Sequence, residues 1–328
     1  TTIVINTKMK VDDEIIKFLT NLQFEENISI ITIEKFMEKY LQKCYIPEED
    51  TDLNYLNDIK PFTSFQYLQK RFIDYLGVFS LLLLVWPILI YSRYRIKKES
   101  PGTSVFKQPR VGLKGKIFKC NKFRSMHLNS YHDPYTREGD SRIFPWGNIM
   151  RKTRIDELPQ MINVLKGDMH FIGPRAEWNI LVENYEKEIP YYNERHLIRP
   201  GITGWAQVNY PYGANIEDTK QKLMYDLYYI KYWNIWLEIK VIWKTILVVI
   251  GKKGISNDSN FKSINDWLIT TRNRINEKNI AYISAKGNDF QNVNFVFIIN
   301  DKNQLPHPRG SWVTDKNLTE ISIYFAVR

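Results

Sequence analysis

The sequence predicts an α+β protein that is attached to a membrane by a proline-broken helix. Short strand-like and helical patterns alternate along most of the chain, which is typical of mixed α and β structure. One long apolar run, Val78–Tyr91, contains Pro87 and has cations on both sides. Aromatic content is 14%, with nine Trp and twenty Tyr, and these side chains favour water–lipid boundaries.

Length, charge and cysteine content limit the class of protein. The 328 residues are enough for two domains. A net charge of +10 indicates anionic partners, namely nucleic acid, phosphorylated small molecules or an acidic bilayer surface. No nucleic-acid-binding motif is found, so nucleic acid is not expected as a partner. Cys44 and Cys120 are far apart in the sequence, which favours a reducing compartment over a disulfide framework.

The two ends of the chain are predicted to form separate units. Residues 1–60 alternate strand and helix and are interpreted as part of an α/β unit without a phosphate-binding glycine loop. The expected elements there are strands Thr2–Ile5 and Ile28–Ile33 and helices Asp12–Leu22 and Ile33–Lys43. Residues 262–328 are predicted to be a small α+β appendage with one helix and strands Ile280–Ala285, Val293–Asn300 and Ile321–Val327. Because the chain begins with Thr1 and a strand-like run, we expect a fragment of a longer protein.

Residues 72–95 are predicted to form a re-entrant membrane helix. A spanning helix needs roughly 20 apolar residues, whereas this run is shorter, follows Asp74 and is interrupted by Pro87. Positive charge flanks both ends, while a spanning helix usually has its excess on one side. A helix that enters the bilayer, bends at Pro87 and returns to the same face explains all three features. The alternatives are a buried core helix and a conventional span.

Between residues 65 and 255 the pattern predicts a domain of short elements. A β-hairpin is expected from Val105–Gln108 and Ile117–Phe123, followed by a mobile loop over residues 127–145. A helical stretch then reaches Arg195, and residues 199–209 are expected to form a loop rich in Gly and Pro. Helix Glu217–Tyr232 precedes Asn234–Ile250, whose apolar side is expected to lie in the membrane interface, with a core helix as the alternative.

Asp156 and Glu157 are the candidate chemical centre. Leu158, Met161 and Leu165 follow at helical spacing, so the carboxylates are expected near the start of a short helix. Cations surround them in the sequence, namely Arg151, Lys152, Arg154, Lys166 and Arg175. The helix terminus and these cations are expected to keep the carboxylates ionised. Such a group holds Mg²⁺ or attacks phosphorus itself; the alternative is an ordinary helix cap.

Several blocks together resemble one family, the bacterial sugar transferases, over residues 70 to about 252. They include Lys70 and Arg71 before the proline-broken helix, Ser100–Gly102 (SPG), Lys122–Met126 (KFRSM), Ile155–Gln160 (IDELPQ), Asn163–Met169 (NVLKGDM), Gly173–Arg175 (GPR) and Arg199–Asn209 (RPGITGWAQVN). Members of this family are monotopic polyprenyl-phosphate sugar-1-phosphate transferases.

The resemblance implies transfer of a sugar 1-phosphate from a UDP-sugar to undecaprenyl phosphate, with release of UMP. It implies that Asp156 is the nucleophile of a covalent phosphosugar-aspartyl intermediate, beside Glu157, and that both carboxylates hold Mg²⁺. Substrate binding is assigned by the same match to Lys122, Arg124, Arg151, Arg175, Arg199 and Gln207. The implied place is the cytoplasmic face of the bacterial inner membrane, with anionic lipids around it, in the first membrane step of exopolysaccharide, O-antigen or glycoconjugate synthesis.

Two departures from the family pattern affect the site. After Asn209 this chain continues with Tyr210-Pro211, where many members carry Gly-Arg-Asn, so one arginine that contacts the nucleotide is absent or replaced. Glu238 stands where relatives carry an Asp that is thought to assist the metal, and no firm role is assigned to it. The sugar and the presence of a homo-oligomer stay open, and a non-catalytic basic scaffold on the membrane surface is the alternative function.

Overall fold

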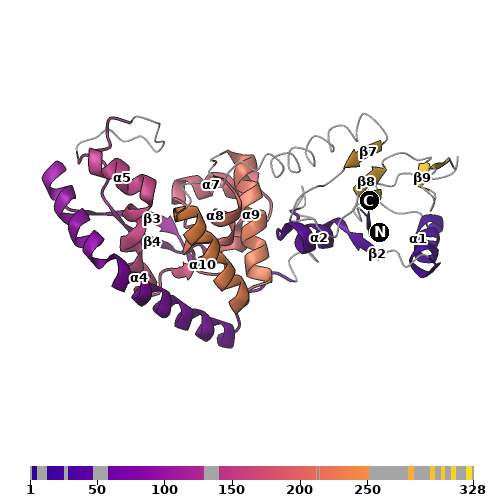
Figure 1. Cartoon of the computed structure of the whole chain (residues 1–328), viewed down its shortest axis with the longest axis horizontal. Helices are drawn as coiled ribbons and strands as arrows, with labels where there is room; N and C mark the ends of the chain where they lie inside the picture. Colours follow the sequence, from indigo (N-terminus) through magenta and orange to yellow (C-terminus); the bar gives the residue numbers. More distant parts are fainter. Residues whose placement is uncertain are drawn as a thin grey trace. The chain divides into compact units, whose positions relative to one another are not determined.

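The computed structural model describes most of the chain up to residue 250 and five short strands beyond it (Figure 1). The described residues are 2–5, 13–25, 29–46, 58–128, 140–211, 213, 215–250, 280–283, 296–299, 304–306, 312–314 and 323–326. The chain divides into two compact units. One comprises Ile46–Ile255, and the other combines Thr1–Tyr45 with Ser256–Arg328.

The terminal unit is built on a five-stranded sheet with the order β2-β1-β11-β8-β7. β1 (Thr2–Ile5) runs parallel to β2 (Ser29–Thr32) and antiparallel to β11 (Ile323–Ala326). Residues 1–60 and 262–328 were predicted to form separate units, yet both contribute strands to this sheet. The remaining elements are α1 (Asp13–Glu25), α2 (Ile33–Phe36), the π-helical turn η1 (Met37–Leu41), β7 (Ile280–Ile283), β8 (Val296–Ile299) and the pair β9 (Gln304–Pro306) and β10 (Trp312–Thr314).

Several sequence predictions for the terminal unit can be compared with these elements. The predicted strands at both ends of the chain are present. The predicted helix Ile33–Lys43 is instead a single α-helical turn that continues as the π-helical turn. The helix expected after residue 262 lies outside the described residues, as does most of the loop expected at 127–145.

The unit Ile46–Ile255 begins with the long helix α4 (Ser64–Glu99), which contains the predicted segment 72–95 and passes through Pro87 without a break. Thr63 and Gln66 form a capping box at its start. The α4 ribbon is bent near its middle (Figure 1). A proline inside a helix removes one backbone hydrogen bond and favours such a bend.

Most of α4 is exposed although it is strongly apolar. It is long and apolar enough to cross a membrane, and only 11% of its most apolar 18-residue window is buried. Leu83 and Leu84 are 77% and 76% exposed. A core helix of a water-soluble domain would bury these side chains, so an exposed apolar surface of this length indicates contact with lipid or with another protein.

One side of α4 packs on the core that supports the site. Val78 joins Cys120, Met161, Val164 and Met169 in a buried cluster. These residues come from α4, from the hairpin of β3 (Val105–Val111) and β4 (Ile117–Phe123), and from α6 (Met161–Lys166) and the turn after it. The predicted hairpin is confirmed, and β3 continues from the predicted strand Val105–Gln108 through Arg110 and Val111, which were expected as a separate short piece.

The second half of this unit packs around a small parallel pair of strands. β5 (His170–Ile172) pairs with β6 (Gly201–Thr203). β6 lies inside residues 199–209, which were expected to form a loop. The strands approach so closely that a Cβ on Gly201 would lie 2.0 Å from the nitrogen of Gly173. The other elements are α5 (Pro145–Thr153), α7 (Asn179–Glu188), the 3-10 turn η4 (Tyr192–Leu197), α8 (Trp205–Asn209), α9 (Ile216–Lys231) and α10 (Ile235–Ile250).

The predicted helices at 217–232 and 234–250 are confirmed as α9 and α10. α10 buries Leu237 and Val241 but exposes Trp236 by 79% and Trp243 by 60%. It therefore has one buried side and one exposed apolar side, as an interfacial helix requires.

Candidate active site

The chain turns sharply just before the carboxylate pair. α5 ends at Thr153, and Arg154 adopts a left-handed backbone conformation with φ 59°. The 3-10 turn η3 (Ile155–Gln160) follows and carries Asp156 and Glu157 in its first turn, before α6 continues the chain. The carboxylates therefore lie near the start of a short helical segment, as predicted, although its first part is a 3-10 turn.

Glu157 is buried among cations. Its side chain is 8% exposed, and Oε1 accepts a hydrogen bond from Lys122 Nζ at 2.9 Å. Arg175 approaches the same oxygen at 3.4 Å and Arg154 at 3.9 Å. Burial opposes ionisation of Glu157, but the charges of Arg175, Lys122 and Arg154 outweigh it and hold its pKa far below the ordinary value. Glu157 is therefore a fixed negative charge.

Asp156 has a different environment from its neighbour. Its Oδ1 atom is buried and has no hydrogen-bond partner in the described part of the chain. Burial, and then the negative charge of Glu157, raise the pKa of Asp156 above its ordinary value, against the charges of Lys122, Arg154 and Arg151. The sequence predicted that the cations would favour the ionised form, but they act mainly on Glu157. The result is a more basic carboxylate with a free oxygen.

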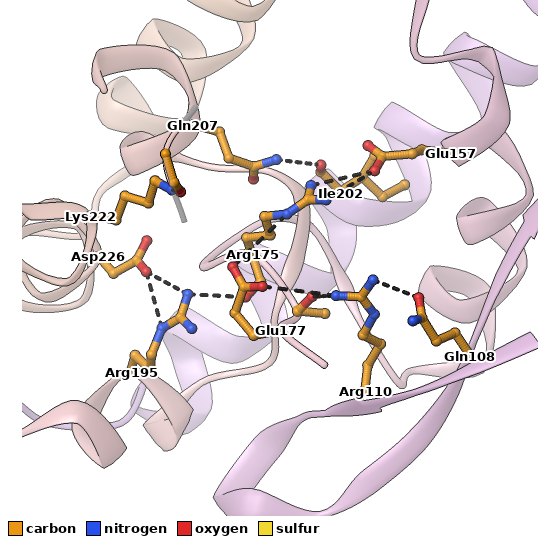
Figure 2. A network of polar contacts seen from close by, with 12 residues as sticks. Gln108, Arg110, Glu157, Arg175, Glu177, Arg195, Ile202, Gln207, Lys222 and Asp226 are labelled. Atoms are coloured by element: carbon orange, nitrogen blue, oxygen red, sulfur yellow. Dashed lines mark hydrogen bonds and ion pairs between the residues drawn. The ribbon is translucent and has the colours of Figure 1, made fainter. Parts of the chain in front are cut away.

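A network of charged side chains holds Arg175 beside Glu157 (Figure 2). Its guanidinium group lies between Glu157 and Glu177, with Nε 4.0 Å from Glu177 Oε1. Arg110 lies 3.9 Å from Glu177 and donates to the carbonyl of Ala176 at 2.9 Å. Arg175 is thus an arginine with charged partners on two sides and a side chain that is 26% exposed.

The residues predicted to bind substrate divide into two groups. Lys122 and Arg175 contact Glu157 directly, and Arg151 adds its charge near Asp156. The other three have structural contacts of their own. Arg124 is buried and donates hydrogen bonds to the carbonyls of Ser100 and Pro101. Arg199 donates a hydrogen bond to the Tyr67 hydroxyl and lies 5.0 Å from the centre of that ring. Gln207 donates a hydrogen bond to the carbonyl of Ile202 at 3.3 Å.

The carboxylate pair can be tested as a site for the Mg²⁺ that the sequence predicts. Among the described residues, no group of three or more His, Cys, Asp and Glu side chains is placed to hold a metal ion. Magnesium often uses only one or two protein carboxylates and takes its other ligands from water and substrate phosphates. Asp156 Oδ1 fits that role, whereas Glu157 Oε1 is occupied by three cations.

Glu238 belongs to a buried polar cluster that the sequence did not reveal. It is 1% exposed and accepts hydrogen bonds from Lys70 Nζ and Trp233 Nε1, both at 2.7 Å, and from the Tyr229 hydroxyl. Lys70 belongs to α4 and is itself fully buried. Glu238 therefore connects α10 to α4, and its oxygens are already occupied. In the sequence, this contact is indicated only by Lys70 and Arg71, two cations just before the apolar run of α4.

Asn163 is a second residue that sequence reasoning left without a role. Its Oδ1 accepts from the backbone and side-chain nitrogens of Asn121 at 2.9 and 2.8 Å. Its Nδ2 donates to the Lys119 carbonyl at 2.8 Å and to Asp168 at 3.0 Å. Asn163 thus connects α6 to β4, the strand that presents Lys122 to Glu157.

The cations beside the carboxylate pair suit anionic ligands, and the exposed apolar surface of α4 suits contact with lipid or another protein. Comparison with known sequences then gives the family. Residues 65–252 match the bacterial sugar transferase profile, and the chain belongs to that family. The predicted resemblance is confirmed.

Curated relatives share this region. A UDP-N-acetylgalactosamine-undecaprenyl-phosphate N-acetylgalactosaminephosphotransferase from Aeromonas hydrophila is 42% identical over 199 residues, covering 60% of this chain and 47% of that protein. A UDP-glucose:undecaprenyl-phosphate glucose-1-phosphate transferase from Caulobacter vibrioides is 38% identical, covering 55% and 68%. An undecaprenyl-phosphate galactose phosphotransferase from Salmonella typhimurium is 36% identical, covering 56% and 41%. The chain thus spans less than half of the first and third relatives.

Proposed function

We propose that this protein transfers a sugar 1-phosphate from a UDP-sugar to a polyprenyl phosphate through a covalent intermediate on Asp156. The observation that carries the proposal is the difference between the two carboxylates. Glu157 is held as an anion by Lys122, Arg175 and Arg154, while Asp156 keeps a buried oxygen without a hydrogen-bond partner in the described residues. Names of relatives, which mention undecaprenyl phosphate and three different sugars, support the reaction class.

The proposed reaction has two steps. A carboxylate oxygen of Asp156 attacks the phosphorus that bears the sugar, and the bond from that phosphorus to the bridging oxygen breaks, so that UMP leaves with the electron pair. An oxygen of the lipid phosphate then attacks the same phosphorus and displaces Asp156, which regains its negative charge. Lys122 and Arg175 stabilise negative charge on the transferred and leaving phosphates. Glu157 prevents these cations from pairing with Asp156 instead.

Asp156 Oδ1 would hold Mg²⁺ together with the diphosphate of the donor, and the other oxygen of the same carboxylate would attack the phosphorus. When bound, the ion supplies neutralisation of the phosphate oxygens. Lys122, Arg151 and Arg175 would surround the same phosphates as fixed charges, because they lie on β4, on α5 and beside β5.

The exposed apolar surfaces support attachment to a membrane, and we propose that this is the cytoplasmic face of the bacterial inner membrane. α4 exposes Leu83, Leu84 and Trp86, and α10 exposes Trp236 and Trp243. We propose that α4 is re-entrant, with the bend at Pro87 returning both ends to one face. A carboxylate site at that surface can contact the phosphate of a long-chain lipid while the hydrocarbon tail of the lipid stays in the bilayer.

UMP release tests the function. The purified protein, in detergent with Mg²⁺ and undecaprenyl phosphate, is incubated with UDP-glucose, UDP-galactose, UDP-N-acetylglucosamine and UDP-N-acetylgalactosamine in turn. We expect UMP and a lipid-linked sugar diphosphate from at least one donor. Absence of UMP with every donor, while the protein is folded and binds acidic liposomes, would instead support a non-catalytic membrane scaffold.

A further inference from the structure

The guanidinium group of Arg175 is held against Glu157, although Arg175 lies in a segment between regular elements. Both of its terminal nitrogens lie 3.4 Å from Glu157 Oε1, yet the residue follows β5 outside any helix or longer strand. A long arginine side chain in such a segment has much conformational freedom to lose. Its geometry at Glu157 therefore depends on how firmly its backbone is fixed.

Arg195 adds a buried side-chain hydrogen bond to that backbone, which also forms an isolated β-bridge with Gly201. Arg195 lies in η4, is 4% exposed, and donates from Nη2 to the carbonyl oxygen of Arg175 at 3.0 Å. The same guanidinium group donates to Asp226 Oδ2 from Nη2 at 2.8 Å and from Nε at 3.2 Å, and to the Tyr192 hydroxyl at 2.8 Å. The planar fork of arginine makes these simultaneous bonds possible, and a lysine cannot reproduce them.

Asp226 completes the connection from α9. It is 2% exposed. Burial raises the pKa of Asp226 to about 6, with the charges of Arg195 and Lys222 acting against this rise and that of Glu177 adding to it. A buried Arg–Asp pair is not an efficient source of stability, since apolar residues of similar volume often stabilise a fold as well or better. Its presence directly behind Arg175 favours a role in the site.

We propose that Arg195 and Asp226 are positioning residues for sugar-phosphate transfer, which hold the backbone of Arg175 so that its guanidinium group faces Glu157 and the donor phosphates. Figure 2 shows the connection from Asp226 through Arg195 to Arg175 and Glu157. Neither residue is proposed to touch the substrate. This inference rests on the proposed function, because it concerns the same phosphate site.

A double-mutant cycle tests the inference. UMP release in a single turnover without acceptor lipid is measured for the unmodified protein, Arg195→Lys, Arg175→Ala and the double variant. Arg195→Lys keeps a positive charge beside Asp226 but removes the fork, and we expect UMP release to slow about tenfold or more. In the Arg175→Ala background the same substitution should cause no further slowing, because nothing remains to be positioned. The thermal midpoint should fall in both backgrounds.

The control is Lys70→Met, which breaks a buried ion pair that does not touch Arg175. Any loss of rate that it causes should multiply with that of Arg175→Ala. If Arg195→Lys does not fold, Asp226→Glu, which lengthens the carboxylate and keeps its charge, enters the same cycle. Equal slowing by Arg195→Lys in both backgrounds, or an unchanged rate in Arg195→Lys, would overturn the positioning role. No UMP release by the unmodified protein would instead overturn the proposed function, and this inference with it.

Discussion

Asp156 and Glu157 are neighbours in the chain but have opposite pKa shifts. Lys122, Arg175 and Arg154 all converge on Glu157, so its charged form is stabilised despite burial. Asp156 is less deeply buried than Glu157, but its own burial and then the negative charge of Glu157 raise its pKa. Pairs of carboxylates with separated pKa values are a common way to divide chemical roles in a site. Here Glu157 orders the cations, and Asp156 is the more basic group.

Removal of the Glu157 charge should change the pH dependence of the first step. The pKa of Asp156 is raised partly by Glu157, and a step that needs ionised Asp156 is lost as the pH falls through that raised pKa. In Glu157→Gln one cause of the rise is gone, so the acid limb of the remaining activity should move to lower pH. The measurement is single-turnover UMP release. The acceptor lipid is left out because its phosphate also titrates near pH 6 and would affect the same limb of the profile.

The matched control for this experiment is Glu188→Gln, at an exposed carboxylate on α7. It should leave the acid limb in place. An acid limb that stays fixed in Glu157→Gln, or that moves to higher pH, would contradict the assignment of charges within the pair.

Residue types at the site could be predicted from the sequence, but their charge states could not. Asp156, Glu157, Lys122 and Arg175 lie in short local motifs that are recognisable without coordinates. Which carboxylate the cations contact depends on side-chain geometry across η3, β4 and the segment after β5. The sequence also does not show which groups a long side chain contacts. Arg124 and Arg199 are predicted to bind substrate, and the structure adds that they donate hydrogen bonds to the Ser100 carbonyl and the Tyr67 hydroxyl.

At the scale of elements, α4 is fastened to the body at both ends. Near its start Lys70 pairs with Glu238 of α10 at 2.7 Å. At its end Glu99 accepts a hydrogen bond from the backbone nitrogen of Trp146 at 2.7 Å, at the beginning of α5. The exposed apolar middle of α4 is thus held between two polar contacts, and these set its direction relative to the carboxylate pair.

The Lys70–Glu238 pair should contribute to stability as a unit. Glu238→Gln removes the nearer counter-charge of the buried Lys70 and leaves Asp74, whose Oδ1 lies 3.9 Å from Lys70 Nζ. Breaking a buried ion pair in this way costs about 3–5 kcal/mol. Addition of Lys70→Met removes the remaining charge, so the double variant should be more stable than Glu238→Gln alone. Thermal midpoints in detergent measure the effect, with the exposed Lys98→Met as a control that should change little. A double variant with the summed loss of both single variants would refute the pairing.

Long elements were easier to predict than short ones. α9 and α10 have clear helical periodicity over 16 residues each, and their predicted bounds were nearly correct. β6 and α8 were expected to be a loop, because three strand residues and five helical residues carry too little pattern. β6 pairs with β5 because Gly173 and Gly201 allow the two backbones to approach, and only the folded chain brings these glycines together.

At the scale of the whole molecule, exposed apolar surface is concentrated on α4 and α10 of the unit Ile46–Ile255. The sequence predicted this unit from its local patterns and family motifs. The shared sheet of the terminal unit could not be predicted, because β1 and β11 are separated by more than 300 residues and antiparallel pairing leaves no mark in either segment.

A re-entrant α4 predicts that both of its ends face the same side of the membrane. Ser64 and Lys97 are exposed near its two ends, and the native Cys44 and Cys120 are buried. In inside-out vesicles, Ser64→Cys and Lys97→Cys should therefore both react with a membrane-impermeant maleimide, while the protein without added cysteine should not. Labelling of the two positions from opposite sides would show a spanning helix instead.

Trapping of the sugar phosphate on the protein tests covalent transfer most directly. The protein is incubated with Mg²⁺ and the active UDP-sugar, which carries ³²P in the phosphate next to the sugar, without acceptor lipid, and is then denatured. We expect label on the peptide that contains Asp156, its loss when undecaprenyl phosphate is added before denaturation, and none in folded Asp156→Asn. Rapid turnover with no labelled protein, or full activity in Asp156→Asn, would contradict nucleophilic attack by Asp156.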